Sequence, residues 1–401
     1  MKKVIDPLIV LLAIIILGAC YSLKIHAQNY LPRIKANSEV TITEDWNLNG
    51  RTVVLPEGVT LNVKRGQIKN GTLVGNMTKL TGKQQSVFNK VTIEGSWNVP
   101  TISSALFFDL SADNALRDVM ALTDTSVNNV VTIEKGIYSI KLVKNQETGI
   151  YVRSNTTLMI NGTIRLTPNA FTNYHVVEAT GRNIVIKGNG TIIGDKGAHT
   201  GASGEWGMGL DVAGGTNVKV SDLTIKDCWG DCIYIGDKSK NVTIDKCTLI
   251  NGRRQGISIT SASGVTIKNC HISKVSGTDP QYGIDVEPNK GCEVDNIIID
   301  NVTVTDCYGG IMCWRNTEAI IKNMTVRNCK VSGTRAKYPL YMMGAEAVKI
   351  ENCEVDSQSD YCVLVQDVNV LNASSNKWNT KGRKPLNTIN VKKKNYNTPE
   401  F

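Results

Sequence analysis

Short segments in which apolar and polar residues alternate recur through most of the chain. Each is followed by a two-residue polar turn and a second short alternating segment. Alternation with a period of two is typical of β-strands that bury one face. The pattern therefore predicts two short strands in each of six superimposable units: NVKVSDLTI (217–225), NVTIDKCTL (241–249), GVTIKNCHI (264–272), NIIIDNVTV (296–304), NMTVRNCKV (323–331) and AVKIENCEV (347–355).

A third short strand follows each unit after a gap. Three short strands in a repeat of 23–32 residues indicate a right-handed parallel β-helix, in which each coil stacks on the preceding one. Residues 155–166 and 183–194 fit the same pattern more loosely. We therefore predict an all-β fold with a β-helix, or solenoid, over residues 101–376. The predicted third strands are CIYIG (232–236), GISIT (256–260), GIDVE (283–287), GIMCW (310–314), PLYMM (339–343) and CVLVQ (362–366).

Two turn positions predict columns of stacked side chains. Amides stacked on successive turns can hydrogen-bond along the axis, and the first column reads Asp222, Lys246, Asn269, Asn301, Asn328 and Asn352. Leucine and valine replace cysteine in the second column, which indicates an inward apolar position where cysteine acts as a small hydrophobe. That column reads Leu223, Cys247, Cys270, Val302, Cys329 and Cys353. Cys247 and Cys270 lie on adjacent coils, so a disulfide between them is an alternative to two free thiols. Cysteine pairs and histidine clusters with zinc-site spacing are absent from the sequence.

The two ends of the repeat differ from its middle. Residues 113–124 (DNALRDVMALTD) have the periodicity of an amphipathic helix, which we expect to cap the open end of the stack. Residues 28–100 are predicted to form a β-rich N-terminal cap or subdomain.

Of the net charge of +9, residues 1–27 carry +2 and residues 377–401 carry +6, so the body carries +1. We interpret residues 377–401 as a basic, solvated tail, and we expect no nucleic-acid partner.

The first 27 residues have the features of a targeting segment. Lys2 and Lys3 precede an apolar run over residues 8–19, which is short for a membrane span and suited to a signal sequence. The stretch LGAC would make Cys20 the lipidated residue of a bacterial lipoprotein, whereas IHAQ would allow cleavage after Ala27. An uncleaved anchor is the third alternative. All three predict an extracytoplasmic protein that is secreted, periplasmic or lipid-anchored, with membrane contact only through this segment.

The predicted third strands share the pattern Gly-apolar-x-apolar-x. Their apolar residues would face the core, so the x positions would face outward and form two columns on one wall. The first column reads Tyr151, Glu178, Asp211, Tyr234, Ser258, Asp285, Met312, Tyr341 and Leu364. The second reads Ala213, Gly236, Thr260, Glu287, Trp314, Met343 and Gln366. Loops before these strands add acidic, basic and aromatic residues, among them Glu205, Trp206, Asp231, Arg254 and Tyr282.

The middle coils of this wall carry the candidate chemistry. Side chains on one face of a strand repeat about every 6.7 Å, which would space Asp285 and Glu287 for an acid, a water and a base. An arginine one coil away could pair with a substrate carboxylate, and a tyrosine or arginine could relay a proton. The predicted catalytic residues are Asp231, Arg254, Asp285 and Glu287. The predicted substrate-binding residues are Trp206, Asp211, Tyr234, Arg253, Gln255, Asp279, Gln281, Tyr282 and Trp314.

The coil pattern over roughly residues 100–370 resembles the pectin-lyase-like superfamily, which includes pectate lyases, polygalacturonases, mannuronan epimerases and phage tailspike depolymerases. WGDCIYIG (229–236) is similar to the Gly-Asp-Asp stretch of polygalacturonases, with Asp231 at the first aspartate and Cys232 replacing the second. The Gly-His-Gly and Arg-Ile-Lys motifs of that family are missing, and neither His199 nor His271 lies on a predicted third strand. The aspartate cluster and the Arg-x-x-Arg pattern of calcium pectate lyases are not evident either.

The resemblance implies an acidic or complex glycan as the substrate. We expect an enzyme that cleaves or modifies a uronate-containing polysaccharide by β-elimination or hydrolysis. The alternative is a non-catalytic glycan-binding or surface-structural β-helix. No cofactor is expected, except that Asp285 and Glu287 could hold Ca²⁺ through their oxygen atoms. The sequence makes no statement about oligomeric state.

Overall fold

The computed structural model describes residues 34–110, 115–382 and 384–396. The chain divides into two units, Met1–Val99 and Pro100–Phe401, each with its own core. The processing sites expected at Cys20 and Ala27 lie outside the described residues. Within the described residues no helix is long and apolar enough to cross a membrane.

The first unit is β-rich, as predicted. All of its strand pairs are parallel, with β5 at the centre pairing with β2, β3, β4 and β6, while β4 also pairs with β1. Apolar side chains from these strands, such as Leu61, Leu73 and Trp97, are fully buried. The strands are β1 (Glu39–Ile42), β2 (Trp46–Asn47), β3 (Thr52–Val54), β4 (Thr60–Val63), β5 (Ile68–Gly82) and β6 (Phe88–Asn98).

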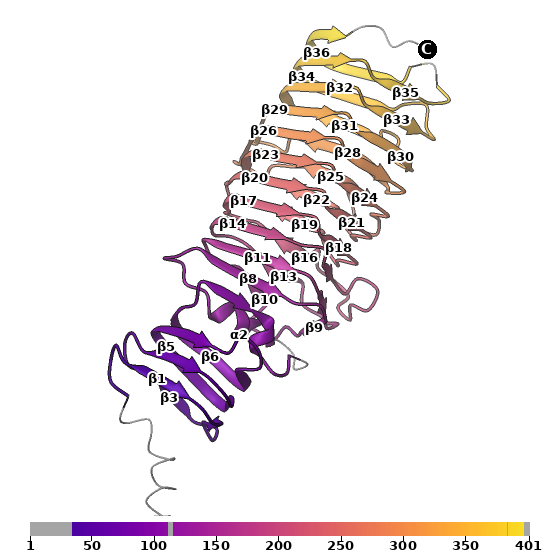
Figure 1. Ribbon diagram of the computed structural model, residues 1–401. Helices are drawn as coiled ribbons and strands as arrows, with labels where there is room; N and C mark the ends of the chain where they lie inside the picture. Colours follow the sequence, from indigo (N-terminus) through magenta and orange to yellow (C-terminus); the bar gives the residue numbers. More distant parts are fainter. Residues whose placement is uncertain (1–33, 111–114, 383, 397–401) are drawn as a thin grey trace, which may run out of the picture. The chain divides into compact units, whose positions relative to one another are not determined.

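The second unit begins with strand β7 (Thr101–Ser103) and helix α2 (Ala115–Ala121), followed by stacked coils of three strands (Figure 1). The helix predicted over residues 113–124 is confirmed over the bounds of α2, and residues 111–114 lie outside the described part. The first strands of the coils are β8 (Asn129–Ile133), β11 (Thr156–Ile160), β14 (Arg182–Lys187), β17 (Thr216–Ser221), β20 (Ser239–Asp245), β23 (Ala262–Lys268), β26 (Glu293–Asp300), β29 (Ile320–Arg327) and β32 (Ala345–Glu351).

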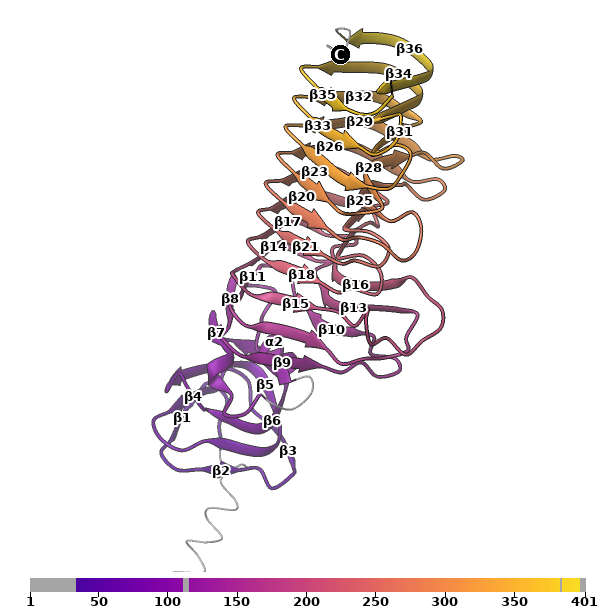
Figure 2. The same cartoon turned by 90° about the vertical axis from the view of Figure 1, so that its right-hand side faces the viewer.

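The second strands form a separate ten-stranded sheet, and Figure 2 shows its members β15, β18 and β21 in succession. They are β9 (Ile137–Ile140), β12 (Thr163–Leu166), β15 (Thr191–Ile193), β18 (Thr224–Lys226), β21 (Thr248–Ile250), β24 (His271–Ser273), β27 (Thr303–Thr305), β30 (Lys330–Thr334), β33 (Glu354–Ser357) and β35 (Lys377–Asn379).

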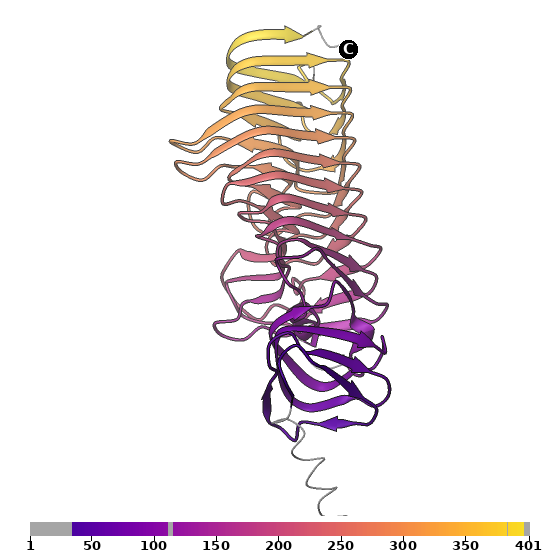
Figure 3. The ribbon, with the colours of Figure 1, turned by 60° about the vertical axis from the view of Figure 1, so that its left-hand side comes forward.

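The third strands make one wall of the stack, here called the third-strand wall. They are β10 (Thr148–Tyr151), β13 (Asn173–Glu178), β16 (Trp206–Asp211), β19 (Ile233–Ile235), β22 (Ile257–Ile259), β25 (Tyr282–Val286), β28 (Gly309–Trp314) and β31 (Leu340–Met343). The long strands β34 (Val363–Ser374) and β36 (Leu386–Tyr396) each span a third strand and the first strand that follows it. Successive coils pair in parallel, so they follow one another in sequence order, as the colours of Figure 3 show.

The core is filled by columns of aliphatic side chains that face inward from successive coils. Ile233, Ile257, Ile284 and Ile311 are register neighbours on the third strands, and all four are fully buried. The predicted orientation of Ile284 and Val286 toward the core is therefore confirmed. Burying one such side chain contributes about 1.5–3 kcal/mol, and the repeat supplies one at every alternate strand position.

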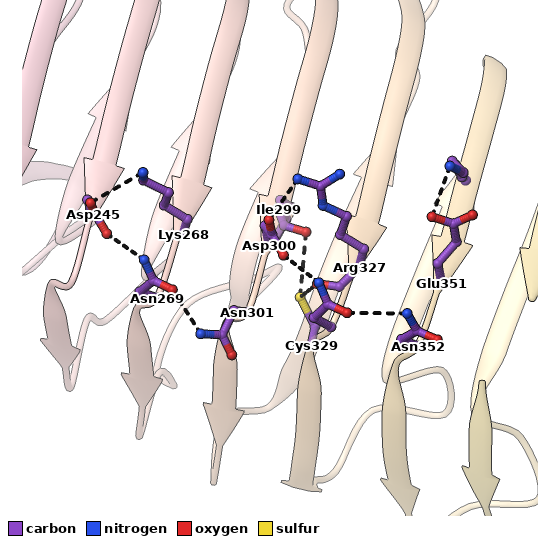
Figure 4. Close-up of polar contacts among 12 residues, drawn as sticks. Asp245, Lys268, Asn269, Ile299, Asp300, Asn301, Arg327, Cys329, Glu351 and Asn352 are labelled. Atoms are coloured by element: carbon purple, nitrogen blue, oxygen red, sulfur yellow. Dashed lines mark hydrogen bonds and ion pairs between the residues drawn. The ribbon is translucent and has the colours of Figure 1, made fainter. Parts of the chain in front are cut away.

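Asparagines of the predicted polar turn column form hydrogen bonds along the axis, partly to one another and partly to the aspartate that precedes the column on the adjacent coil. Asn269 donates to Asp245 over 2.8 Å and Asn301 donates to Asn269 over 2.8 Å (Figure 4). Asn328 continues the column with a 2.8 Å bond to Asp300. These asparagines have φ between 52° and 55°, the left-handed region that asparagine enters more readily than most residues. Asparagine therefore serves both the turn and the hydrogen bond between coils.

The cysteine column is buried, in agreement with the prediction. Cys247, Cys270, Cys329 and Cys353 are between 1% and 3% exposed. All ten cysteines of the described residues are free thiols, so the alternative of a Cys247–Cys270 disulfide is not adopted. The Cys270 thiol beside Cys247 raises the pKa of Cys247, which keeps that thiol in its neutral form.

The interpretation of residues 377–401 as a solvated tail is wrong for most of that segment. Strand β35 pairs with β33, and β36 pairs with β34 over nine residue pairs. Lys392, Lys393 and Lys394 are consecutive on β36 and all three are exposed, so the charge lies on the surface of a regular coil. Its apolar residues are few, which is why the alternation was not recognised in the sequence.

Candidate functional site

The third-strand wall carries the first predicted outward column in full register. Consecutive pairs run Tyr151–Glu178, Glu178–Asp211, Asp211–Tyr234, Tyr234–Ser258, Ser258–Asp285, Asp285–Met312, Met312–Tyr341 and Tyr341–Leu364. Neighbours in this column are separated by one coil, about 4.8 Å. Residues far apart in the sequence therefore lie side by side.

A further column lies three residues ahead of the outward position on each of three successive coils. Asp231, Gln255 and Tyr282 occupy it on successive coils, since the amides of Cys232 and Gly256 bond the carbonyl oxygens of Gln255 and Tyr282. All three residues are at most 7% exposed. The two columns lie beside each other, since Gln255 of this column bonds Asp285 of the outward column.

The positively charged Arg254 lies among several acidic side chains. Its Nη1 donates to Asp231 Oδ2 over 3.1 Å, and its Nε lies 3.7 Å from Glu205 Oε2. Burial alone would lower the pKa of Arg254, but the charges of Asp231, Asp285, Glu205 and Glu287 raise it overall. Arg254 therefore stays protonated and compensates several carboxylates at once.

Asp231 is fully buried against this arginine. Burial raises the pKa of Asp231 to about 6, and the positive charge of Arg254 opposes the rise. At neutral pH the Asp231 carboxylate is therefore mostly ionised, and it gains a proton in mildly acidic solution.

Asp285 lies on the same wall and is only 1% exposed. Gln255 Nε2 donates to Asp285 Oδ2 over 2.9 Å, while the oxygen of the same amide accepts from the backbone nitrogen of Tyr282 over 2.8 Å. The alternation predicted an outward-facing position for Asp285. Its side chain does point away from the core, but it is buried and bonded by Gln255.

The pKa values of Asp285 and Glu287 are both raised and depend on each other. Burial, and then the charge of Glu287, raise the pKa of Asp285 well above its ordinary value. Burial also raises the pKa of Glu287, while Arg254 and a hydrogen bond from Asp285 oppose that rise. Burial and the charge of Glu287 therefore favour the protonated form of Asp285. The spacing of these two carboxyl groups for an acid, a water and a base stays a prediction.

Four polar atoms of this cluster are buried and have no hydrogen-bond partner within the described residues. They are Asp231 Oδ1, Arg254 Nε, Ser258 Oγ and Asp285 Oδ1. Buried polar atoms are almost always paired, because an unmet one costs roughly 1–3 kcal/mol. Four of the ten such atoms among the described residues lie on these three neighbouring coils, so unmet polar groups are concentrated here.

Several predicted substrate contacts serve the packing instead. Arg253 lies over the Trp229 ring, 3.8 Å from its centroid, and its Nη1 donates to Gly204 O over 3.0 Å. Tyr282 is 7% exposed and donates its hydroxyl to Tyr338 O over 3.0 Å. The substrate-binding roles of Arg253 and Tyr282 stay predictions, and these contacts show that both side chains also hold neighbouring segments in place.

The remaining predicted residues divide by exposure. Asp279 and Gln281 bond each other over 2.7 Å in the loop before β25, outside the buried cluster, and Gln255 is fully buried, where it positions Asp285. Tyr234 is half-buried and its hydroxyl lies 2.7 Å from Thr260 Oγ1. Aromatic surface open to a ligand is provided by Trp206 and Trp314, which are 49% and 36% exposed.

The sequence analysis missed His175. It lies on β13, with its Nδ1 3.3 Å from Asp211 Oδ2 and 3.5 Å from Glu178 Oε2. Burial opposes its charge, but Glu178 and Asp211 raise the pKa of His175 overall. The spacing in the sequence could have identified it. His175 precedes the outward Glu178 by three residues, and the same offset separates Asp231 from Tyr234 and Gln255 from Ser258. His199 and His271 lie off the third strands, as predicted.

A metal at Asp285 and Glu287 was the alternative expected for this pair. In the described part of the chain, no group of three or more His, Cys, Asp or Glu residues is arranged to hold a metal ion. Carboxyl groups, an amide and a guanidinium gathered in this way can take part in hydrogen bonding and acid–base chemistry.

The comparisons with known proteins agree with this architecture. The family model described as "Right handed beta helix region" matches residues 126–316 and 279–383. The SPbeta prophage-derived uncharacterized protein YorA of Bacillus subtilis (strain 168) is 31% identical over 222 residues, 47% of this chain and 37% of that protein. The uncharacterized protein YclG of the same organism is 32% identical over 169 residues, 37% of this chain and 29% of that protein.

Among solved structures, the polygalacturonase from Erwinia carotovora ssp. carotovora aligns with 75% of this chain and 95% of its own, with a TM-score of 0.47 and 14% identity. The chain spans about a third of the length of the two relatives from Bacillus subtilis. The family match and the parallel coils together confirm the predicted right-handed parallel β-helix.

Proposed function

The chain belongs to the family of right-handed β-helix regions, and from the buried carboxyl cluster on its wall we propose that it hydrolyses a glycosidic bond in an acidic polysaccharide. The observation that carries the proposal is the buried cluster in which Arg254 bonds Asp231 and Gln255 bonds Asp285, with burial raising the pKa of both carboxyl groups. A hydrolase that acts without a cofactor needs one carboxyl group as proton donor and one carboxylate as base or nucleophile.

The roles follow from the two protonation states. Asp285 donates its proton to the glycosidic oxygen as the bond to the anomeric carbon breaks. Asp231 takes a proton from the water that attacks this carbon, so one water is consumed for each bond cleaved. Their backbones lie two coils apart along the axis, about 9.6 Å, and Asp231 stands a further three residues ahead of the column that holds Asp285.

Hydrolysis is better supported than β-elimination. An elimination needs a group that neutralises the uronate carboxylate, and the sequence analysis assigned that role to Arg254. The Arg254 guanidinium is instead occupied by Asp231 and faces Glu205. A carboxyl group that keeps its proton, as the raised pKa of Asp285 favours, suits protonation of a leaving-group oxygen more than abstraction of a carbon-bound proton.

The coils that follow the carboxyl cluster support an acidic sugar as part of the substrate. Tyr341 stands two coils beyond Asp285 in the outward column, and its ring lies nearly parallel to that of Tyr338, with centroids 6.3 Å apart. The Lys337 ammonium lies 5.3 Å from the Tyr338 centroid and 5.4 Å from that of Tyr361. Half-exposed rings with a cation beside them suit a sugar ring that bears a carboxylate.

We also propose that the protein acts outside the cytoplasm, on the basis of residues 1–27 alone. Mass spectrometry of the mature protein from its natural host tests this. A lipid on Cys20 or a new N-terminus at Gln28 would support it, and an intact cytoplasmic chain would contradict it.

The activity is tested on a panel of acidic glycans, including polygalacturonate, alginate and hyaluronan, by following new reducing ends and the ultraviolet absorbance of unsaturated products. We expect reducing ends without that absorbance. The Asp285→Asn variant should lose about 10²–10⁴-fold in rate, whereas Asp237→Asn, an exposed aspartate at φ 49°, serves as the matched control. Unsaturated products would favour a lyase, and glycan retention with neither signal would favour a binding protein.

A further inference from the structure

A cavity of about 260 Å³ opens beside helix α2 and strand β10, at the N-terminal end of the third-strand wall. It is lined by Arg117, Met120, Ala121, Gln146, Thr148, Gly149, Tyr151 and Arg153. Helix and strand lie next to each other in Figure 1. The cavity lies five coils before β25, about 24 Å from Asp285 at 4.8 Å a coil, so it is separate from the carboxyl cluster.

The two arginines of the cavity are held in place by backbone carbonyl groups. Arg117 donates from Nε to Gly149 O over 2.9 Å and from Nη2 to Thr148 O over 2.8 Å. Arg153 donates from Nη1 to Thr123 O over 2.8 Å. A guanidinium carries five N–H groups, and these bonds use only two in Arg117 and one in Arg153. Neutral carbonyl groups fix the side chains without cancelling their charge.

The charges around the cavity are unbalanced. No acidic side chain is among the described residues that line it. Asp118, next to Arg117 in the sequence, raises the pKa of Arg117 against the lowering effect of burial, which is the larger of the two. Glu178, the register neighbour of Tyr151 on the next coil, is bonded to Thr148 and lies against His175. The two guanidinium groups therefore face the cavity with their charge largely unmet.

We propose that this cavity is an anion-binding site for a carboxylate or sulfate group. Fixed guanidinium groups bind planar or tetrahedral oxyanions through pairs of charge-assisted hydrogen bonds. Tyr151 is 46% exposed and adds an aromatic face at the rim, which suits an anion carried on a sugar ring more than a free inorganic ion. The site is independent of the proposed hydrolysis and would bind an anion even if the wall catalysed nothing.

The binding test uses sodium glucuronate, sodium sulfate and uncharged methyl glucoside as probes, titrated by calorimetry at constant ionic strength. Glucuronate should bind and methyl glucoside should not. Sulfate binding as tight as that of glucuronate would identify a general oxyanion site, and preference for glucuronate would identify a sugar-acid site. Either result supports an anion site. Failure of both anions to bind would overturn it.

The location is tested by a matched pair at the half-buried Ala121. Ala121→Glu places a negative charge in the cavity, whereas Ala121→Gln adds the same bulk without charge. The first should weaken anion binding about tenfold or more and the second much less. Arg153→Gln should weaken binding about tenfold, with the exposed Arg165→Gln on β12 as control. Anion affinity that is equal in both Ala121 variants and unchanged in Arg153→Gln would place the anion elsewhere and contradict the proposal.

Discussion

Gln255 Nε2 donates a 2.9 Å hydrogen bond to Asp285 Oδ2 from the preceding coil, and both residues are buried. The same Gln255 amide accepts from the backbone of Tyr282. One glutamine therefore fixes the orientation of the acidic side chain and anchors the start of the strand that carries it. In the proposed function Gln255 positions the proton donor without touching the substrate.

Replacement of Gln255 by alanine should lower both stability and turnover. The Tyr282 amide and Asp285 Oδ2 would lose their partners, which costs about 1–3 kcal/mol in the free energy of unfolding. Urea denaturation measures this cost, and steady-state kinetics should give a reduced kcat with a nearly unchanged KM. A rise in KM at constant kcat would instead mean that Gln255 binds the substrate.

The rate should depend on pH through Asp231. Its pKa of about 6 predicts that activity falls as the pH drops below about 6, because the base becomes protonated. Arg254 lowers this pKa, so Arg254→Gln should move the acid limb of kcat/KM to higher pH. The exposed Arg182→Gln is the control, with an unchanged limb. An acid limb at the same pH in Arg254→Gln would argue against Asp231 as the group observed.

Asp231 should also make the free energy of unfolding depend on pH, in the direction opposite to that of most carboxylates. Its folded pKa of about 6 is above its ordinary value of 3.8, so the folded protein binds the extra proton between these two pH values. Its stabilising contribution is present below about pH 4 and is lost as the pH rises through about 6, by roughly 3 kcal/mol. Asp231→Asn should lack this loss. Denaturation curves of the two proteins across this range measure the difference, and parallel pH profiles would contradict it.

The asparagine ladder can be tested at Asn328, which has a φ of 55° and donates to Asp300. Asn328→Ala loses the hydrogen bond and forces a β-carbon into the left-handed region, at about 1–2 kcal/mol for the backbone alone. Asn328→Gly loses the bond but tolerates the backbone angle. Chemical denaturation should rank wild type above the glycine variant and the alanine variant lowest. Equal stability of the two variants would show that the backbone angle is not what asparagine provides.

Much of the architecture could be predicted from the sequence because the β-helix repeats its pattern locally. Alternation set which residues of each third strand face the core, and stacking then brought Asp285 beside Ser258 and Met312 without further information. The same reasoning placed Asp231, Arg254, Asp285 and Glu287 on neighbouring coils.

The side-chain partners could not be predicted in the same way. Arg253 and Arg254 are adjacent in the sequence, yet the first packs on Trp229 and only the second joins Asp231. That choice depends on the path of the loop between β21 and β22, which has no repeating pattern. The burial of Asp285 likewise depends on Gln255 and on loops that the strand pattern does not describe.

The central claim is that Asp285 keeps a proton at neutral pH beside Glu287. Infrared difference spectroscopy of the wild type against Asp285→Asn measures this directly, because a protonated carboxyl group has a carbonyl band distinct from that of a carboxylate. We predict a protonated carboxyl band at neutral pH that is lost in the variant. The absence of that band from the wild type at neutral pH would contradict the assignment of Asp285 as the acid.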